Sequence, residues 1–212
     1  MLLALAINSI ESIQSFIFYL IQYSLSNLNA FILLIAIGYS LYAYNDKNIN
    51  HNNLIDKNNS PIQLISQLKG FFFINSFLAL SLSITLFSFA GIPPLLGFFA
   101  KLMVFSAALQ DGFIFLTLIA VLTSVISAVY YLFIVKTMFF DNHSYSYFSK
   151  LNGLKLPAMV LQNDKVVNKI YFSKFSLSNS LSITISVLTL FILLFMASPN
   201  ELIHFINILG LL

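Results

Sequence analysis

Lys101 is the residue of this sequence with the clearest chemical potential, because it lies within an apolar stretch between Pro94 and Asp111. In a helix, its distance along the chain from those two residues places it about 10–15 Å from either end. A lysine at the centre of a bilayer costs from about 3 to more than 10 kcal/mol, so it normally faces a bundle interior or a water-filled cavity. Burial disfavours the charged form of a lysine, which lets the amine take up and release a proton. Lys101 is therefore a candidate for proton transfer.

A helix-breaking run, Gly91-Ile92-Pro93-Pro94, precedes this lysine. Proline lacks a backbone donor and clashes with the preceding turn, and the second proline also excludes the α conformation from the first. The break should leave the carbonyls of about Phe87 to Ala90 without helical partners, where they can stabilise a cation. Gly97 is small enough to admit water or a neighbouring backbone. In the alternative interpretation, Lys101 extends to one membrane surface and the proline pair is only a tight turn between helices.

Composition decides the environment of these residues. The chain has 212 residues, of which 59% are hydrophobic and only 8% charged, and its mean hydropathy is +0.91. Soluble domains carry about 25% charged residues. The surface of any fold of this chain would be apolar, so its solvent must be lipid. We therefore predict an all-α, polytopic bundle of about five transmembrane helices plus a partial first helix, with a helix broken at 91–94.

The apolar segments define the expected organisation. Residues 1–7 are too short to span a bilayer, and Asn8 and Glu11 have the spacing of a capping box that would start a helix running to about Tyr44. Further spans are expected over residues 71–90, 95–109, 113–140 and 177–196. The chain then divides into a membrane module over 1–140, a polar loop over 141–176, and a last helix with an interfacial tail over 177–212.

Polar side chains inside the first long helix could extend a proton route. Ser24, Asn27 and Asn29 lie in its middle and need polar partners in lipid, so they should face a bundle. They form a candidate polar relay for Lys101. The more common role of such residues is to hold helices together, and that alternative stays open.

Several function classes are excluded by residues that the chain lacks. It has no cysteine, which rules out disulfides, thiolate zinc sites and iron–sulfur clusters within it. Its three histidines are far apart and suggest no metal site, and without arginine or a basic patch nucleic-acid binding is not expected. No nucleophile–base pair, phosphate loop or dinucleotide motif is present. Activity should therefore be transport across the membrane or assembly with partners.

Charge in the two polar segments predicts an orientation. Residues 141–177 contain five lysines against two aspartates, whereas residues 45–60 contain two of each. If every helix crosses fully, the two segments lie on opposite sides, and the positive-inside rule places 141–177 on the cytoplasm-like side, which is the matrix in a mitochondrion. A re-entrant segment over 91–109 would reverse one half of this topology.

The run from Leu86 to Lys101, LFSFAGIPPLLGFFAK, resembles the antiporter-like subunits of respiratory NADH:ubiquinone oxidoreductase (complex I), in particular subunit 2. Residues 124–132 and 2–7 resemble the same family, with a fungal mitochondrial character. The resemblance implies a pair of inverted five-helix repeats, each with a broken helix and a nearby lysine, and it places Lys101 on the proton-transfer lysine of the second repeat. Family members carry many more helices before this region, so we expect a partial, truncated or split subunit.

The resemblance also implies a function. It predicts a membrane-arm core subunit that couples electron transfer from NADH to ubiquinone to proton translocation, within a multisubunit enzyme and without independent catalytic activity. Its partners would be other membrane-arm subunits and the lipid of the mitochondrial inner membrane. No cofactor is expected on this chain, because NADH, flavin, iron–sulfur clusters and ubiquinone would bind elsewhere in the complex. The alternatives are a non-catalytic scaffold fragment of the membrane arm and a subunit of a cation/proton antiporter.

Overall fold

The computed structural model describes residues 2–7, 9–41, 44–46, 64–142, 145–147 and 179–195. Their elements, in chain order, are α1 (Leu2–Ala6), α2 (Ile10–Leu41), β1 (Tyr44–Asp46), the 3-10 turns η2 (Ile65–Leu68) and η3 (Phe71–Phe73), α3 (Ser76–Ala90), α4 (Leu96–Gln110), α5 (Ile114–Phe140), β2 (Tyr145–Tyr147) and α6 (Asn179–Leu194).

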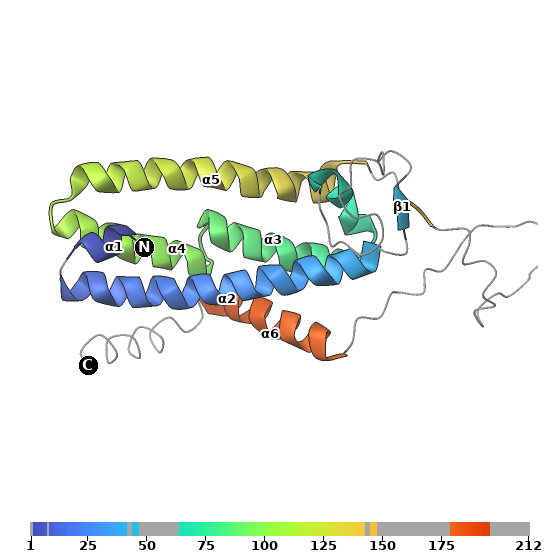
Figure 1. The fold of residues 1–212 in the computed structure, drawn as a ribbon, viewed down its shortest axis with the longest axis horizontal. Coiled ribbons are helices and arrows are strands. Elements are labelled where there is room, and N and C mark those ends of the chain that lie inside the picture. Colours follow the sequence, from blue (N-terminus) through green and yellow to red (C-terminus); the bar gives the residue numbers. More distant parts are fainter. Residues whose placement is uncertain are drawn as a thin grey trace, which may run out of the picture.

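The helices form an elongated bundle (Figure 1). The long helices α2 and α5 run along opposite sides, and α3 and α4 lie end to end between them. Helix α1 lies at the end of the bundle where α2 begins, and α6 packs against α2 and α3. Both α2 and α5 are long and apolar enough to cross a bilayer, and α3, α4 and α6 are shorter apolar helices. The predicted all-α membrane bundle is confirmed.

Local sequence accounts for where the helices start. Ser9 and Ser12 cap α2 reciprocally: each hydroxyl accepts the backbone N–H of the other, at 3.3 and 3.2 Å. The expected capping pair was wrong in register, because serine hydroxyls one residue along make these bonds; Asn8 lies outside the described residues. Asn75 caps α3 through its side-chain oxygen, 3.3 Å from the backbone nitrogen of Leu78.

The predicted break at 91–94 is confirmed, since α3 ends at Ala90 and α4 begins at Leu96. The Pro93–Pro94 peptide bond is cis. The two short helices have 15 residues each and together follow the length of α2 (Figure 1). Because the chain continues in the same direction after the break, α3 and α4 act as one broken crossing.

A short antiparallel ladder corrects the predicted topology. Strand β1 follows α2, strand β2 follows α5, and Tyr44 pairs with Tyr147. The polar segments that continue from these strands therefore begin at the same end of the bundle, and their expected placement on opposite sides is wrong. The physical reason is that α3 and α4 make one crossing between them rather than two. Most of the 45–60 loop, nearly all of the 141–176 loop and the tail after residue 195 lie outside the described residues, so the proposed division of the chain there stays a prediction.

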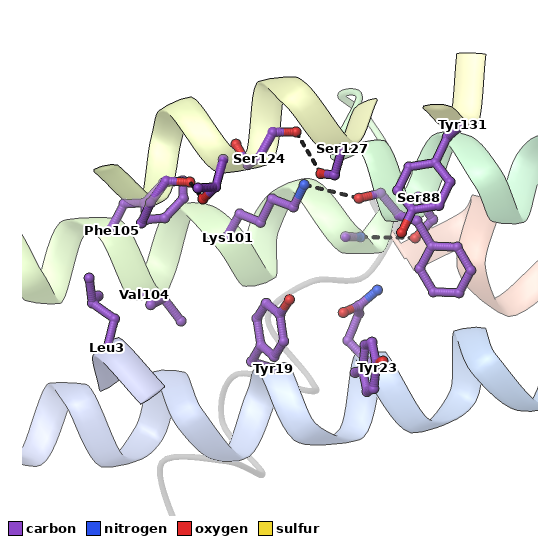
Figure 2. A pocket seen from close by; sticks show the side chains of 15 residues that line it. Leu3, Tyr19, Tyr23, Ser88, Lys101, Val104, Phe105, Ser124, Ser127 and Tyr131 are labelled. Atoms are coloured by element: carbon purple, nitrogen blue, oxygen red, sulfur yellow. Dashed lines mark hydrogen bonds between the residues drawn. The ribbon is translucent and has the colours of Figure 1, made fainter. Parts of the chain in front are cut away.

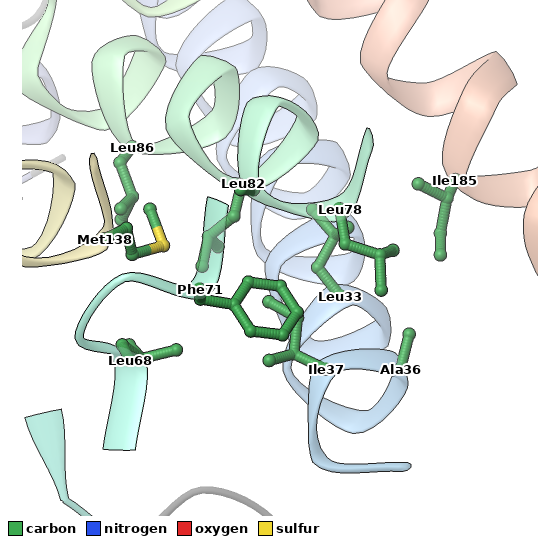
Figure 3. Close-up of a cluster of buried hydrophobic side chains, with 11 residues drawn as sticks. Leu33, Ala36, Ile37, Leu68, Phe71, Leu78, Leu82, Leu86, Met138 and Ile185 are labelled. Carbon is green, nitrogen blue, oxygen red and sulfur yellow. The ribbon is translucent and has the colours of Figure 1, made fainter. Parts of the chain in front are cut away.

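Two apolar clusters fill the bundle. Cluster 1 joins the second half of α2 to α3, η2, η3, α5 and α6 near the strand end (Figure 3). Its fully buried members include Leu33, Ile37, Phe71 and Met138. Cluster 2 joins the first half of α2 to α4 through Phe18, Leu96, Ala100 and Phe195. The helix break lies between them along the bundle.

Candidate functional site around Lys101

Lys101 folds back onto the helix break (Figure 2). It lies in the second turn of α4 and is half-buried. Its Nζ donates hydrogen bonds to the carbonyl oxygens of Phe89, at 2.9 Å, and Ala90, at 2.8 Å. Hydrogen bonds from a charged donor are roughly twice as strong as neutral ones. The ammonium is therefore held by the end of the preceding half-helix.

The geometry of the break explains why these two carbonyls are available. Gly91 has a left-handed backbone with φ 84°. Its N–H and that of Ile92 both point back, to the carbonyls of Ser88 at 3.1 Å and Phe87 at 3.1 Å respectively, as in a Schellman cap. Those bonds satisfy the carbonyls of Phe87 and Ser88. The last two carbonyls of α3 remain, and Lys101 takes both.

Glycine is required at two places where the half-helices meet. A methyl group at Gly91 would lie 3.0 Å from Cδ and 3.1 Å from Nζ of Lys101. At Gly97, a methyl group would overlap the carbonyl oxygen of Ser88, and the Gly97 N–H donates to Ser88 Oγ at 3.2 Å. These close approaches keep the start of α4 against the end of α3 and thereby place Lys101 over the break.

A cavity of about 290 Å³ adjoins the lysine and is walled by α1 to α5. Figure 2 shows α2 on one side of it and α5 on the other, with Lys101 between them. Its polar lining comes from Tyr19, Gln22 and Tyr23 of α2, Ser88 of α3, and Thr123, Ser124, Ser127 and Tyr131 of α5. Apolar groups such as Leu3, Val104 and Phe105 line the rest.

The hydroxyl groups of α5 can act as acceptors toward the cavity. Ser124 donates to the carbonyl of Val121 at 2.8 Å, and Ser127 donates to the carbonyl of Ser124 at 2.8 Å. Each hydroxyl oxygen retains lone pairs for a further hydrogen bond. These residues would ordinarily be assigned to packing alone, but their position lets them bind water or an ammonium group.

Uncharged groups surround the lysine. In the part of the chain that the structure describes, Lys101 forms no ion pair, and no three His, Cys, Asp or Glu side chains gather to hold a metal ion. The site contains backbone carbonyls and side-chain hydroxyls, and both can form hydrogen bonds to a protonated amine or to water. Such a site can hold a protonated amine and a few water molecules.

The comparison with known families bears on the region that contains this site. A family model described as "NADH:quinone oxidoreductase/Mrp antiporter, TM" matches residues 1–127, which include the break and Lys101. The chain belongs to this family of NADH:quinone oxidoreductase and antiporter proteins. The resemblance seen in the sequence is thereby confirmed.

Relatives of this chain occur in a fungus, a plant and a bacterium. The chain is 45% identical over 213 residues to NADH-ubiquinone oxidoreductase chain 2 of Rhizopus oryzae, covering 100% of this chain and 38% of that protein. It is 39% identical over 133 residues to the protein of the same name from Oenothera berteroana, covering 63% and 23% of the two chains. It is 36% identical over 146 residues to NADH-quinone oxidoreductase subunit N of Pelagibacter ubique, covering 69% and 27%. The chain thus spans about a quarter to two fifths of the length of these relatives.

The three residues of the expected polar relay do not line the cavity. Ser24 is exposed, and its hydroxyl donates to the carbonyl of Leu20 at 2.9 Å. Asn27 is half-buried, and Asn29 is fully buried away from the cavity lining. Each residue of an α-helix is rotated by about 100° from the one before it, so side chains that are close in sequence can point in different directions. For this reason the three residues do not meet at one site.

The residues of α2 that do reach the cavity share one helical face. Tyr19, Gln22 and Tyr23 have the i, i+3, i+4 spacing that places side chains side by side. That spacing was a readable signal in the sequence. The sequence alone could not give the rotation of α2 about its own axis relative to α4. That rotation decides which face of α2 lies near Lys101.

Proposed function

We propose that this chain is a piece of a membrane-arm core subunit of the proton-translocating NADH:ubiquinone oxidoreductase of the mitochondrial inner membrane. Family membership and the similarity to the fungal chain 2 support this assignment. The observation that carries it is the placement of Lys101, whose ammonium is bound by two carbonyls of the break beside a polar cavity. The chain itself would bind neither NADH nor ubiquinone.

Lys101 would act by alternating between its protonated and neutral forms. The ammonium donates to the carbonyls of Phe89 and Ala90, and these two hydrogen bonds hold Nζ at the break. After a proton leaves to water in the cavity, the neutral amine keeps two N–H donors but has lost its positive charge, so its hydrogen bonds to those carbonyls are weaker. The neutral amine then turns toward the polar lining, from which it can take up another proton. Redox chemistry elsewhere in the complex would drive the alternation.

The partners would be lipid and other membrane-arm subunits. Helix α5 exposes most of its large apolar residues, and none of its most apolar stretch is buried inside the chain. Such a surface is stable only against hydrocarbon or apolar helices. These contacts would account for assembly into a larger complex.

The strand end of the bundle would face the mitochondrial matrix. Both polar segments begin there, including residues 141–177 with their five lysines. Lys69 and Lys136 lie near the same end, because the N–H of Gly70 donates to the carbonyl of Thr137 in the last turn of α5. At the opposite end the described residues include Glu11 and Asp111. The positive-inside rule then assigns the lysine-rich end to the matrix.

Replacing Lys101 with alanine in the assembled membrane complex tests the proposal. We expect K101A to assemble normally and to translocate fewer protons per NADH oxidised, measured in sealed vesicles. Lys136→Ala is the matched control, because Lys136 lies near the end of α5 and does not line the cavity. Unchanged pumping by a normally assembled K101A complex would reject proton transfer by Lys101 and favour a scaffold role.

A further inference from the structure

We infer that Tyr19 is the residue that returns a proton to Lys101 after the amine has released one, through the water of the cavity that both residues line. Tyr19 rises from α2 with its hydroxyl end pointing into the cavity toward Lys101, which projects from α4 (Figure 2). This role rests on the proposed function, because it requires a lysine that alternates between its protonated and neutral forms.

The cavity has room for the water that this transfer needs. Its volume is about 290 Å³. A water molecule in the liquid takes about 30 Å³, so several fit. Polar groups of α2, α3 and α5 line the cavity and can supply the two to four hydrogen-bond partners that an enclosed water needs. The hydroxyl of Tyr19 and the amine of Lys101 therefore share one hydrated space.

The hydroxyl groups of α5 on the cavity wall already donate their protons elsewhere. Thr123, Ser124 and Ser127 donate to carbonyls of their own helix, at 3.0, 2.8 and 2.8 Å respectively. The hydroxyl of Tyr19 forms no hydrogen bond to any other residue that the structure describes. A phenol is also more acidic than the hydroxyl of serine or threonine. Tyr19 is therefore the better proton donor to the cavity.

Two other tyrosines line the cavity, but each is placed differently. Tyr23 is 43% exposed, so it lies at the outer edge. Tyr131 packs against cluster 1, on the other side of the helix break. Tyr19 instead packs against cluster 2, which contains Ala100, the residue before Lys101. Tyr19 therefore lies beside the turn of α4 that carries the lysine.

The transfer conserves atoms and charge. The phenol O–H bond of Tyr19 breaks, its proton passes to a cavity water, and that water gives a proton to the lone pair of Lys101 Nζ. The electron pair of the broken bond stays on the phenolate oxygen, and the resulting phenolate and ammonium attract each other. A hydrated proton that arrives along the cavity water then neutralises the phenolate. The ammonium can return to the carbonyls of the break.

Tyr19→Phe in the assembled complex tests this role, because it removes the hydroxyl and keeps the ring. The ring packs against cluster 2 and stacks on Tyr23 with centroids 6.2 Å apart, so we expect normal assembly and an unchanged melting temperature. Proton translocation should slow about tenfold, which is less than the roughly 100-fold loss of an irreplaceable acid, because cavity water can partly replace the phenol. The solvent deuterium isotope effect should rise, because proton transfer then limits the rate.

Tyr39→Phe is the matched control, because Tyr39 lies on the same helix, is 62% exposed and does not line the cavity. It should leave proton translocation unchanged, and Tyr131→Phe should slow it less than Tyr19→Phe does. A Tyr19→Phe complex that pumps like the control would overturn the inference, as would an equally slow Tyr131→Phe complex. A lower melting temperature of Tyr19→Phe with an unchanged isotope effect would show a structural role instead and would also overturn it.

The variant K101A separates this inference from the proposed function. Poor pumping by K101A together with normal pumping by Tyr19→Phe would reject the role of Tyr19 alone. Normal pumping by both variants would reject proton transfer by Lys101 as well. Slow pumping by both, with the raised isotope effect in Tyr19→Phe, is the expected result.

Discussion

Replacing Gly97 with alanine is expected to separate the two halves of the broken helix. The added methyl carbon would overlap the carbonyl oxygen of Ser88 and lie 2.7 Å from its carbonyl carbon. Carbon atoms in normal contact are about 3.5–4.0 Å apart, so α4 must shift by at least about 1 Å. The shift would also stretch the bond between the Gly97 N–H and Ser88 Oγ, now 3.2 Å. Overpacking and one lost hydrogen bond together amount to about 2–4 kcal/mol.

Gly97→Ala should displace Lys101 as well as lower the stability of the subunit. Lys101 lies one turn after Gly97, so moving the start of α4 carries Nζ away from the carbonyls of Phe89 and Ala90. We expect a lower melting temperature of the detergent-solubilised complex, less assembled subunit and slower proton translocation.

Gly112→Ala serves as the control for this substitution. Gly112 has φ 81°, but a new methyl group there would meet nothing within 4 Å. It should lose only about 1–2 kcal/mol to left-handed backbone strain and should leave proton translocation unchanged. A Gly97→Ala complex that melts no lower than Gly112→Ala and pumps normally would refute the close contact of α3 with α4.

Two further substitutions address the lysine and the topology. Gly91→Ala strains a backbone with φ 84° and brings a methyl group to 3.1 Å from Lys101 Nζ; we expect a loss of about 1–2 kcal/mol in stability and slower proton translocation, and normal translocation would show that the docked lysine is dispensable. Because the chain has no cysteine, Lys69→Cys and Asp111→Cys can be labelled singly with a membrane-impermeant maleimide in oriented vesicles. We expect labelling of the first only from the matrix side and of the second only from the opposite side; labelling of both from one side would contradict the arrangement of the helices.

The helix break and its lysine were predictable because their causes are local. Proline cannot donate a hydrogen bond wherever it occurs, and glycine tolerates the left-handed backbone that ends α3. The availability of carbonyls near Ala90 followed from the same reasoning. The sequence could not show that Lys101 itself would occupy them, because that depends on the Lys101 side chain folding back from α4 onto the end of α3.

The candidate relay failed to reach the cavity for a geometric reason. Ser24 and Asn27 are as polar as Gln22 and only a few residues away, yet the rotation of α2 directs Ser24 outward and Gln22 into the cavity. That rotation is set by packing on both sides, through Phe18 in cluster 2 and Leu33 in cluster 1. Contacts between helices that are distant in sequence set this rotation. The composition of α2 alone therefore cannot predict it.

The sequence by itself determined that lipid surrounds the chain, that the fold is helical and where the helix breaks. It also determined that a charge costly to bury lies near the break. Each follows from the chemistry of single residues or short runs, such as a charged fraction of 8% or two adjacent prolines. Only the tertiary structure decided which groups surround Lys101 and on which side the polar segments begin. The reason is that α3 and α4 continue one another as a single crossing, which pairs β1 with β2 and encloses the lysine between α2 and α5.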